Sequence, residues 1–114
     1  MDLSNKKGGI VLGTGNMSEI ALGWSTYNAD HMSMYNVNSG LPKTLLREVV
    51  RYVKDHSDNA RISKVLADII DTPVSPELLP TNDDGTIKQE TENTVGPYEL
   101  HDFFIYHLIR NNSK

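Results

Sequence analysis

The sequence contains no cysteine, and only 2 phenylalanines and 1 tryptophan occur in its 114 residues. Without cysteine the chain can have no disulfide, no cysteine nucleophile and no zinc–thiolate site. This fits a reducing compartment, and we expect the cytoplasm. Positive charge is also scarce, with 11 Lys and Arg against 15 Asp and Glu and a formal net charge of −4. Nucleic-acid binding requires clustered positive charge, so we expect no nucleic-acid partner.

Long apolar runs are missing as well. No stretch of the sequence approaches the roughly 20 apolar residues that a membrane-spanning helix requires. No basic segment followed by an apolar core marks a secretory signal. We therefore expect no membrane partner. The length of 114 residues allows one domain with a small core.

A short strand and a short helix flank a glycine turn near the N-terminus. Residues 10–12 are three consecutive apolar residues bounded by glycines, which is typical of a buried strand in a parallel sheet. Residues 14–16 form the turn, and a helix is expected over 19–24 with Asn16 as its N-cap. Residues 25–41 show no sustained hydrophobic period, so we expect a long structured loop there.

Three further helices are predicted from apolar residues at helical spacing. One opens at Pro42, a second covers about 59–70, and a third opens at Pro97. Their apolar stripes are Leu45, Leu46, Val49, Val50 and Val53; Ile62, Val65, Leu66, Ile69 and Ile70; and Leu100, Phe103, Phe104, His107 and Leu108. Residues 81–94 contain a single apolar residue, so we expect a mobile loop there.

The predicted elements indicate an α/β fragment that is mostly helical, with one short parallel-type strand and about four helices. A lone buried strand requires partners on its edges. Either the chain is a piece of a larger α/β domain, or it pairs with another copy of itself. The apolar stripes favour self-association, and we expect a homo-oligomer.

Residues 13–18, Gly-Thr-Gly-Asn-Met-Ser, follow the strand and open the helix as a dinucleotide-binding turn does. A helix N-terminus offers N–H groups to a phosphate. The alternative is a glycine turn that only packs a strand against a helix. The acidic residue expected about 20 positions later is missing. Glu19, three residues after Asn16, fits either a capping box or a ligand of Mg²⁺ beside bound phosphates.

Lys43 is expected in the first turn of a helix, where its charge faces the positive end of the helix dipole. The placement makes sense if an anion binds there, because backbone amides and the ammonium would converge on it. The alternative is a solvated lysine.

Trp24 and Tyr27 flank Ser25 and Thr26. These four could bind a ring and a ribose or phosphate, or they could cap the short helix with core aromatics. No pattern indicates a nucleophile–base pair or paired carboxylates for acid–base chemistry, so no catalytic residue is predicted.

Four segments together resemble the ATP-dependent synthetase domain of the glutamine-dependent NAD synthetase family: residues 11–27, 36–44, 72–78 and 95–103. The likeness runs from about residue 2 to residue 111. It implies a doubly wound α/β domain that binds an adenine nucleotide. It also implies the family's reaction, in which ATP and Mg²⁺ adenylate the nicotinate carboxylate of deamido-NAD, releasing pyrophosphate, and ammonia then displaces AMP to form NAD.

The resemblance implies roles for individual residues. The positions that contact ATP are matched by Thr14, Lys43 and Ser75. The positions that contact deamido-NAD are matched by Glu19, Trp24, Ser25, Thr26 and Tyr27, and Glu19 also matches the magnesium ligand. We therefore expect the side chains of residues 14, 19 and 43 to share one hollow with a nucleotide's phosphates.

Two family features are not found in this chain. One is the Ser-Gly-Gly-x-Asp-Ser loop that grips pyrophosphate, and the other is the glutaminase domain that supplies ammonia from a Glu-Lys-Cys site. We expect the chain to cover the later half of the synthetase domain and to be inactive alone. The alternative is a truncated, non-catalytic module for nucleotide binding or assembly.

Overall fold

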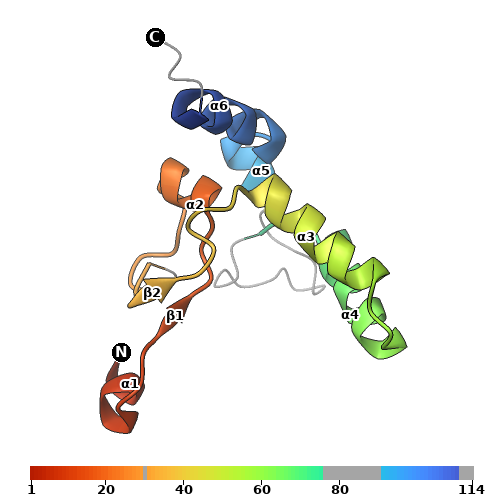
Figure 1. Ribbon diagram of the computed structural model, residues 1–114. Coiled ribbons are helices and arrows are strands. Elements are labelled where there is room, and N and C mark those ends of the chain that lie inside the picture. Colours follow the sequence, from red (N-terminus) through yellow and green to blue (C-terminus); the bar gives the residue numbers. More distant parts are fainter. Residues whose placement is uncertain (30, 76–90, 111–114) are drawn as a thin grey trace, which may run out of the picture.

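The computed structural model describes residues 1–29, 31–75 and 91–110 (Figure 1). Within these ranges lie α1 (Asp2–Lys7), β1 (Leu12–Gly13), α2 (Met17–Leu22), β2 (Tyr35–Asn36), α3 (Lys43–Asp55), α4 (Ala60–Asp71), α5 (Thr91–Val95) and α6 (Tyr98–Arg110). Figure 1 shows α3 and α4 side by side, with α6 beside the N-terminal end of α3 and α1 beyond the start of β1. The N-terminal ends of α2, α3 and α6 thus come together in space.

The two strands form a parallel sheet, and the first covers Leu12–Gly13 rather than the predicted 10–12, with Leu12 exposed rather than buried. The register of the sheet pairs Leu12 with Tyr35 and Gly13 with Asn36. The second strand lies within the segment 25–41, which the sequence predicts as loop, so the first strand has one partner in the described part of the chain. Each strand has only two residues, too few to show an alternating apolar pattern. A Cβ atom on Gly13 would collide with the Ser33 side chain, so glycine allows β1 to approach the segment that leads into β2.

Local capping signals set where the helices begin. Asn16 is the N-cap of α2, as predicted, although this helix spans Met17–Leu22 rather than 19–24. It ends at Gly23, whose φ of 64° lies in the left-handed region that glycine adopts without strain. The Asn59 side chain accepts hydrogen bonds from two amides in the first turn of α4. Pro42 precedes α3 but supplies no capping side chain.

Two short helices were not predicted. The first is α1, at the N-terminus, and the second is α5. Residues 81–90 of the predicted mobile loop lie outside the described residues, and residues 91–94 belong to α5. The predicted α/β character is confirmed, because the described chain is mostly helical and contains a parallel sheet.

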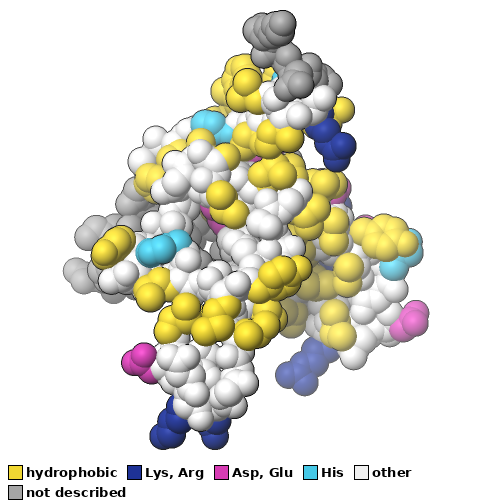
Figure 2. Space-filling view, turned by 60° about the vertical axis from the view of Figure 1, so that its left-hand side comes forward, with side chains coloured by type: hydrophobic (Ala, Val, Ile, Leu, Met, Phe, Trp, Pro, Cys, Tyr) yellow, Lys and Arg dark blue, Asp and Glu magenta, His cyan; other side chains and the backbone are white. Residues whose placement is uncertain are grey.

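Few apolar side chains are buried. Among the described residues Tyr98 is the one buried apolar side chain, at 2% exposure. The radius of gyration is 16.3 Å, whereas a compact domain of this length has about 13 Å. Figure 2 shows hydrophobic side chains spread over the surface on the face drawn there. No helix in the described ranges has the length and apolar character to cross a membrane.

The last helix turns an unexpected face inward. Most of its predicted apolar stripe is exposed, including Phe103 at 57% and Phe104 at 54%. The buried residues of α6 are Tyr98 and Asp102, which lie one helical turn apart. The helix therefore directs an aromatic ring and a carboxylate toward the rest of the chain.

Candidate functional site

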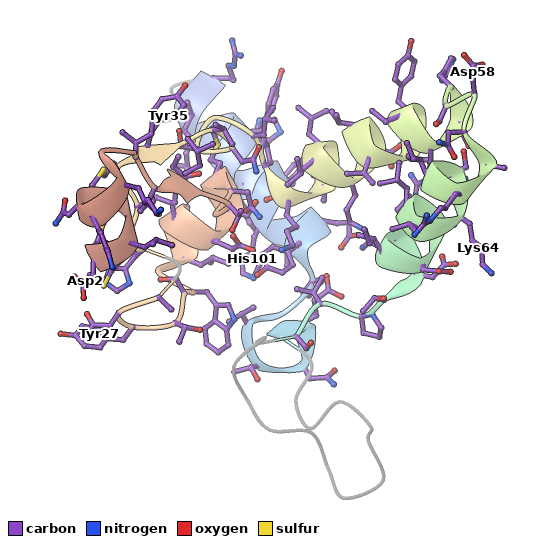
Figure 3. All side chains as sticks on the ribbon, turned by 90° about the horizontal axis from the view of Figure 1, so that it is seen from below. Asp2, Tyr27, Tyr35, Asp58, Lys64 and His101 are labelled. Atoms are coloured by element: carbon purple, nitrogen blue, oxygen red, sulfur yellow. The ribbon has the colours of Figure 1, made fainter. Side chains whose placement is uncertain are left out.

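A cavity of about 740 Å³ lies where the glycine turn, α2, α3, α4 and α6 approach one another. Its lining includes seven of the eight site residues predicted from the sequence, namely Thr14, Glu19, Trp24, Ser25, Thr26, Lys43 and Ser75. The predicted common hollow for residues 14, 19 and 43 is therefore confirmed, while the ligands of these residues stay a prediction. Tyr27 does not line the cavity. Its side chain is 83% exposed and points outward in Figure 3.

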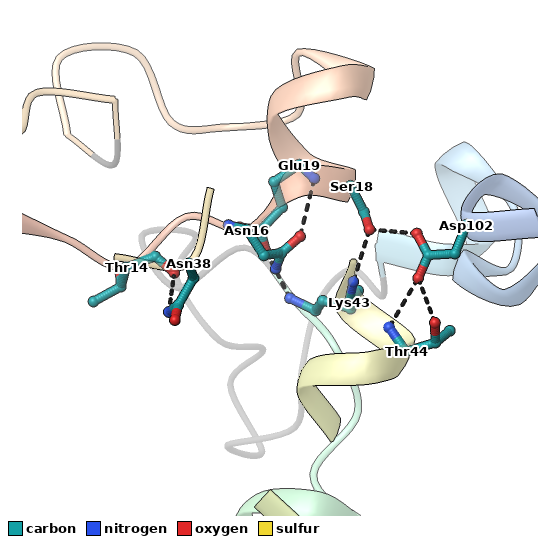
Figure 4. Close-up of polar contacts among 8 residues, drawn as sticks. All are labelled: Thr14, Asn16, Ser18, Glu19, Asn38, Lys43, Thr44 and Asp102. Carbon is teal, nitrogen blue, oxygen red and sulfur yellow. Dashed lines mark hydrogen bonds and ion pairs between the residues drawn. The ribbon is translucent and has the colours of Figure 1, made fainter. Parts of the chain in front are cut away.

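Glu19 and Lys43 form an ion pair at the cavity. The distance from Lys43 Nζ to Glu19 Oε1 is 2.6 Å, and both side chains are mostly buried. The other carboxylate oxygen, Oε2, accepts a hydrogen bond of 3.0 Å from the backbone amide of Asn16. The Asn16 side chain in turn accepts one of 3.1 Å from the amide of Glu19. The capping box is thus present, and it leaves the other carboxylate oxygen, Oε1, paired with Lys43 (Figure 4).

The first turn of α3 is held by side chains from two other helices. The Lys43 amide donates to Ser18 Oγ at 2.8 Å. The amide and the hydroxyl of Thr44 both donate to Asp102 Oδ2, at 2.8 and 2.7 Å. Ser18 Oγ donates to the other oxygen, Asp102 Oδ1. Asp102 therefore caps α3 from α6 and supplies the acceptor that the Pro42 side chain cannot offer (Figure 4).

This arrangement corrects the sequence-based prediction for Lys43. We expected the first-turn amides and the ammonium to converge on one anion. The amides of Lys43 and Thr44 instead face Ser18 and Asp102, whereas the ammonium faces Glu19. The buried carboxylate already occupies the helix N-terminus. Only the ammonium of Lys43 is directed toward the cavity.

The glycine turn supports the cavity and also packs against the sheet. The Thr14 carbonyl accepts a hydrogen bond of 3.3 Å from the Asn38 side chain. A Cβ atom on Gly15 would lie 3.2 Å from the side-chain nitrogen of Asn36, so this glycine permits a close approach. The turn therefore packs closely against the segment that contains β2. The same turn brings Thr14 and Gly15 into the cavity lining.

Tyr98 lies beneath the ion pair. Its ring centroid is 5.3 Å from Lys43 Nζ, within cation–π range. Its hydroxyl is buried and has no hydrogen-bond partner among the described residues. Burial raises the pKa of Tyr98 to about 12, and the negative charges of Glu19, Glu92 and Asp102 add to the rise. The phenol therefore stays protonated at neutral pH.

The acidic residues of the site offer a limited metal-binding set. Within the described ranges no group of three or more His, Asp or Glu side chains could hold a metal ion. Among the residues that the structure describes, Glu19 is the one carboxylate that lines the cavity. Magnesium is commonly held by one or two protein carboxylates together with phosphate oxygens and water. The site therefore fits Mg²⁺ only in company with a phosphate ligand.

Three residues of the site escaped the sequence-based prediction: Ser18, Tyr98 and Asp102. Ser18 is 0% exposed and Asp102 is 6% exposed. The sequence signal for Asp102 is an acidic residue among apolar neighbours in a predicted helix, four positions after Tyr98. A buried carboxylate requires donors, so such an acid indicates a polar contact inside the fold.

Comparison with known proteins identifies relatives over almost the whole chain. The family described as NAD synthase matches residues 1–113. The glutamine-dependent NAD(+) synthetase of Mycobacterium tuberculosis (strain H37Rv) is 46% identical over 110 residues, which cover 95% of this chain and 16% of that protein. The protein of the same name from Mycobacterium leprae is also 46% identical over 110 residues, with the same coverage of both chains. The one from Acinetobacter baylyi is 31% identical over 112 residues, or 98% of this chain and 19% of that protein.

The chain thus spans less than a fifth of the length of these relatives. The match covers the glycine turn, the ion pair and the helices around the cavity. On this evidence the chain belongs to the NAD synthase family.

Proposed function

We propose that this chain forms part of a glutamine-dependent NAD synthetase and contributes to the binding of ATP and deamido-NAD. The observation that carries the proposal is the meeting of seven predicted site residues from separate segments around one cavity. The reaction is the ATP-dependent amidation of deamido-NAD to NAD through an adenylated intermediate. The ammonia would come from a glutaminase domain outside this chain.

Lys43, Thr14 and Ser75 are the proposed ATP contacts. Lys43 is the basic residue among the described residues of the cavity lining, so its ammonium would offset the negative charge of the phosphates. Thr14 and Ser75 add hydroxyl groups, which can donate hydrogen bonds to phosphate or ribose oxygens. A phosphate that binds Lys43 must compete with Glu19, whose Oε1 lies 2.6 Å from the ammonium.

Glu19 is the proposed magnesium ligand. When Lys43 turns to a phosphate, the Oε1 atom of Glu19 loses its partner, while Oε2 stays tied to the amide of Asn16. That carboxylate would then hold Mg²⁺ together with phosphate oxygens. Bound there, Mg²⁺ would supply positive charge against the negative charge on the phosphates.

Deamido-NAD is assigned to Glu19 and to the loop after α2. Trp24, Ser25 and Thr26 line the cavity and offer an aromatic ring and two hydroxyls. Tyr27 is exposed outside the cavity, so it would contact a part of the dinucleotide that extends beyond it. We also propose a cytoplasmic location and a homo-oligomer for the protein.

A segment exchange tests the proposal. The matching 110 residues of the Mycobacterium tuberculosis relative would be replaced by those of this chain, and NAD formation measured from deamido-NAD, ATP and ammonium. We expect turnover, and we expect its loss on Lys43→Ala but not on Lys64→Ala. Lys64 is the matched control, an exposed lysine on α4 that points away from the rest of the chain in Figure 3. A correctly folded hybrid without turnover would contradict the proposed function.

Ligand binding can be followed in the chain itself. Trp24 is the single tryptophan and lines the cavity, so its fluorescence reports on the proposed deamido-NAD site. In the isolated chain, a fluorescence change with deamido-NAD that Ser25→Ala weakens would support the assignment. An unchanged response in the variant would remove Ser25 from it.

A further inference from the structure

The start of α3 depends on groups outside the helix. The first amides of any helix have no partner within it and require acceptors from elsewhere. Pro42, the N-cap, has no side chain that can accept a hydrogen bond. The acceptors for Lys43 and Thr44 come from Ser18 on α2 and Asp102 on α6. Two helices therefore fix the origin of a third.

Asp102 is the centre of this contact. Its carboxylate receives three hydrogen bonds, from Ser18 Oγ and from the amide and hydroxyl of Thr44. Among the described residues no basic side chain forms an ion pair with it. The 6% exposed carboxylate is thus stabilised by neutral donors and by the positive end of the α3 dipole. Removing it would leave all three donors without their acceptor.

We propose that Asp102 is a positioning residue for Lys43, and the proposal rests on the function proposed above. Both the backbone amide and the side-chain ammonium of Lys43 are held by contacts with other residues. Its amide reaches Asp102 through Ser18, and its ammonium pairs with Glu19 at the cavity. Since α3 begins at Lys43, a shift in the first turn moves the ammonium directly. The carboxylate of Asp102 thereby sets where the positive charge of the site lies.

Asp102 does not act on a ligand itself. It is absent from the cavity lining, and both its oxygens are engaged in hydrogen bonds. Its effect must pass through Ser18 and Thr44 to the backbone of Lys43. The expected consequence is a change in the environment of one lysine, rather than a general loss of structure.

The test uses the ligand-free chain and two local measurements. One is the rate at which an amine-acylating reagent labels Lys43, compared with Lys64 in the same sample. The other is hydrogen exchange at the Thr44 amide. In Asp102→Ala we expect both the Lys43 labelling rate and the Thr44 exchange rate to rise about tenfold, with Lys64 unchanged. Asp102→Asn keeps one acceptor oxygen and should give intermediate rates.

Three outcomes would overturn the proposal. The first is Lys43 labelling that stays at the wild-type rate in a folded Asp102→Ala variant. The second is labelling that rises equally at Lys43 and Lys64, which indicates general loosening. The third applies if the Ala variant does not fold: it is a Thr44→Val variant, which removes one donor to Asp102, that labels Lys43 at the wild-type rate or speeds Lys43 and Lys64 labelling equally. These measurements involve no ATP, so their failure is distinct from a hybrid enzyme without turnover.

Discussion

Glu19 and Lys43 pair across two helices, with 2.6 Å between Oε1 and Nζ, although 24 residues separate them in the sequence. The carboxylate has two roles: Oε1 pairs with Lys43, and Oε2 accepts a hydrogen bond from the Asn16 amide in the capping box of α2. The two interpretations of Glu19 from the sequence, capping box and ligand in a phosphate site, are therefore compatible. The two roles can be separated by a substitution that keeps the cap of α2 and removes the negative charge.

Substitution of Glu19 separates the cap from the charge. Glutamine at this position can still bond the Asn16 amide, but it loses the ionic attraction to Lys43. We expect Glu19→Gln to lower the free energy of unfolding by less than about 1 kcal/mol. Glu19→Ala loses both contacts and should cost more, about 1–2 kcal/mol. Urea unfolding of the two variants measures the difference, and equal losses would show that the cap contributes nothing.

Lys43→Ala removes the proposed positive charge from the phosphate site. In the hybrid synthetase we expect turnover to fall by about 100-fold or more, as for the loss of a charge-stabilising donor in an active site. Pyrophosphate release is the measurement, with Lys64→Ala as the control for loss of a lysine. Near-normal release in Lys43→Ala would remove this residue from the mechanism.

Tyr98→Phe deletes a buried hydroxyl that has no partner among the described residues. An unsatisfied buried donor costs about 1–3 kcal/mol, so its removal should leave stability unchanged or raise it by about 1 kcal/mol. Urea unfolding of the ligand-free chain checks the sign. A clear loss of stability would mean that the hydroxyl makes a hydrogen bond.

The raised pKa of Tyr98 predicts a stability loss at alkaline pH. The ordinary value is 10.0 and the folded value is about 12. Below pH 10 both states keep the proton, so the group adds no pH dependence. Between pH 10 and 12 the unfolded chain releases the proton while the folded chain keeps it, and stability falls as the pH rises. Ultraviolet titration of the 5 tyrosines should show a late step that Tyr98→Phe abolishes.

The exposed face of α6 predicts self-association. Phe103 and Phe104 are more than half exposed on one helix, and exposed apolar area favours contact with another surface. Sedimentation velocity should show oligomers that dissociate in a Phe103→Ser, Phe104→Ser double variant. Tyr27→Ser, which removes an exposed aromatic ring elsewhere, should leave the oligomers intact. A compact monomer at high concentration would contradict the prediction.

Short-range features were predictable from the sequence. The cap at Asn16 and its bond to Glu19 depend on residues three positions apart, and this spacing alone determines the contact. Lys43 could be singled out because its charge opposes the helix dipole. The family resemblance then linked these residues to Trp24 and Ser75, which line the same cavity.

Long-range features were not predictable. The hydrogen bonds from Thr44 to Asp102 join residues 58 positions apart, and no sequence feature of either segment indicates this contact. The second strand has two residues and no readable pattern. The inward face of α6 was missed because the hydrophobic period follows the exposed residues, whereas polar contacts select the buried Asp102.

The burial of a single apolar side chain, Tyr98, among the described residues has a thermal consequence. Unfolding would bring less new hydrocarbon into water than in a compact domain of this length, so the heat-capacity increment should fall below the usual value of about 12–15 cal/mol/K per residue. The free energy of unfolding would then vary with temperature along a shallow curve. Cooling would lower the free energy of unfolding of such a chain less than that of a protein stabilised by a large hydrophobic core.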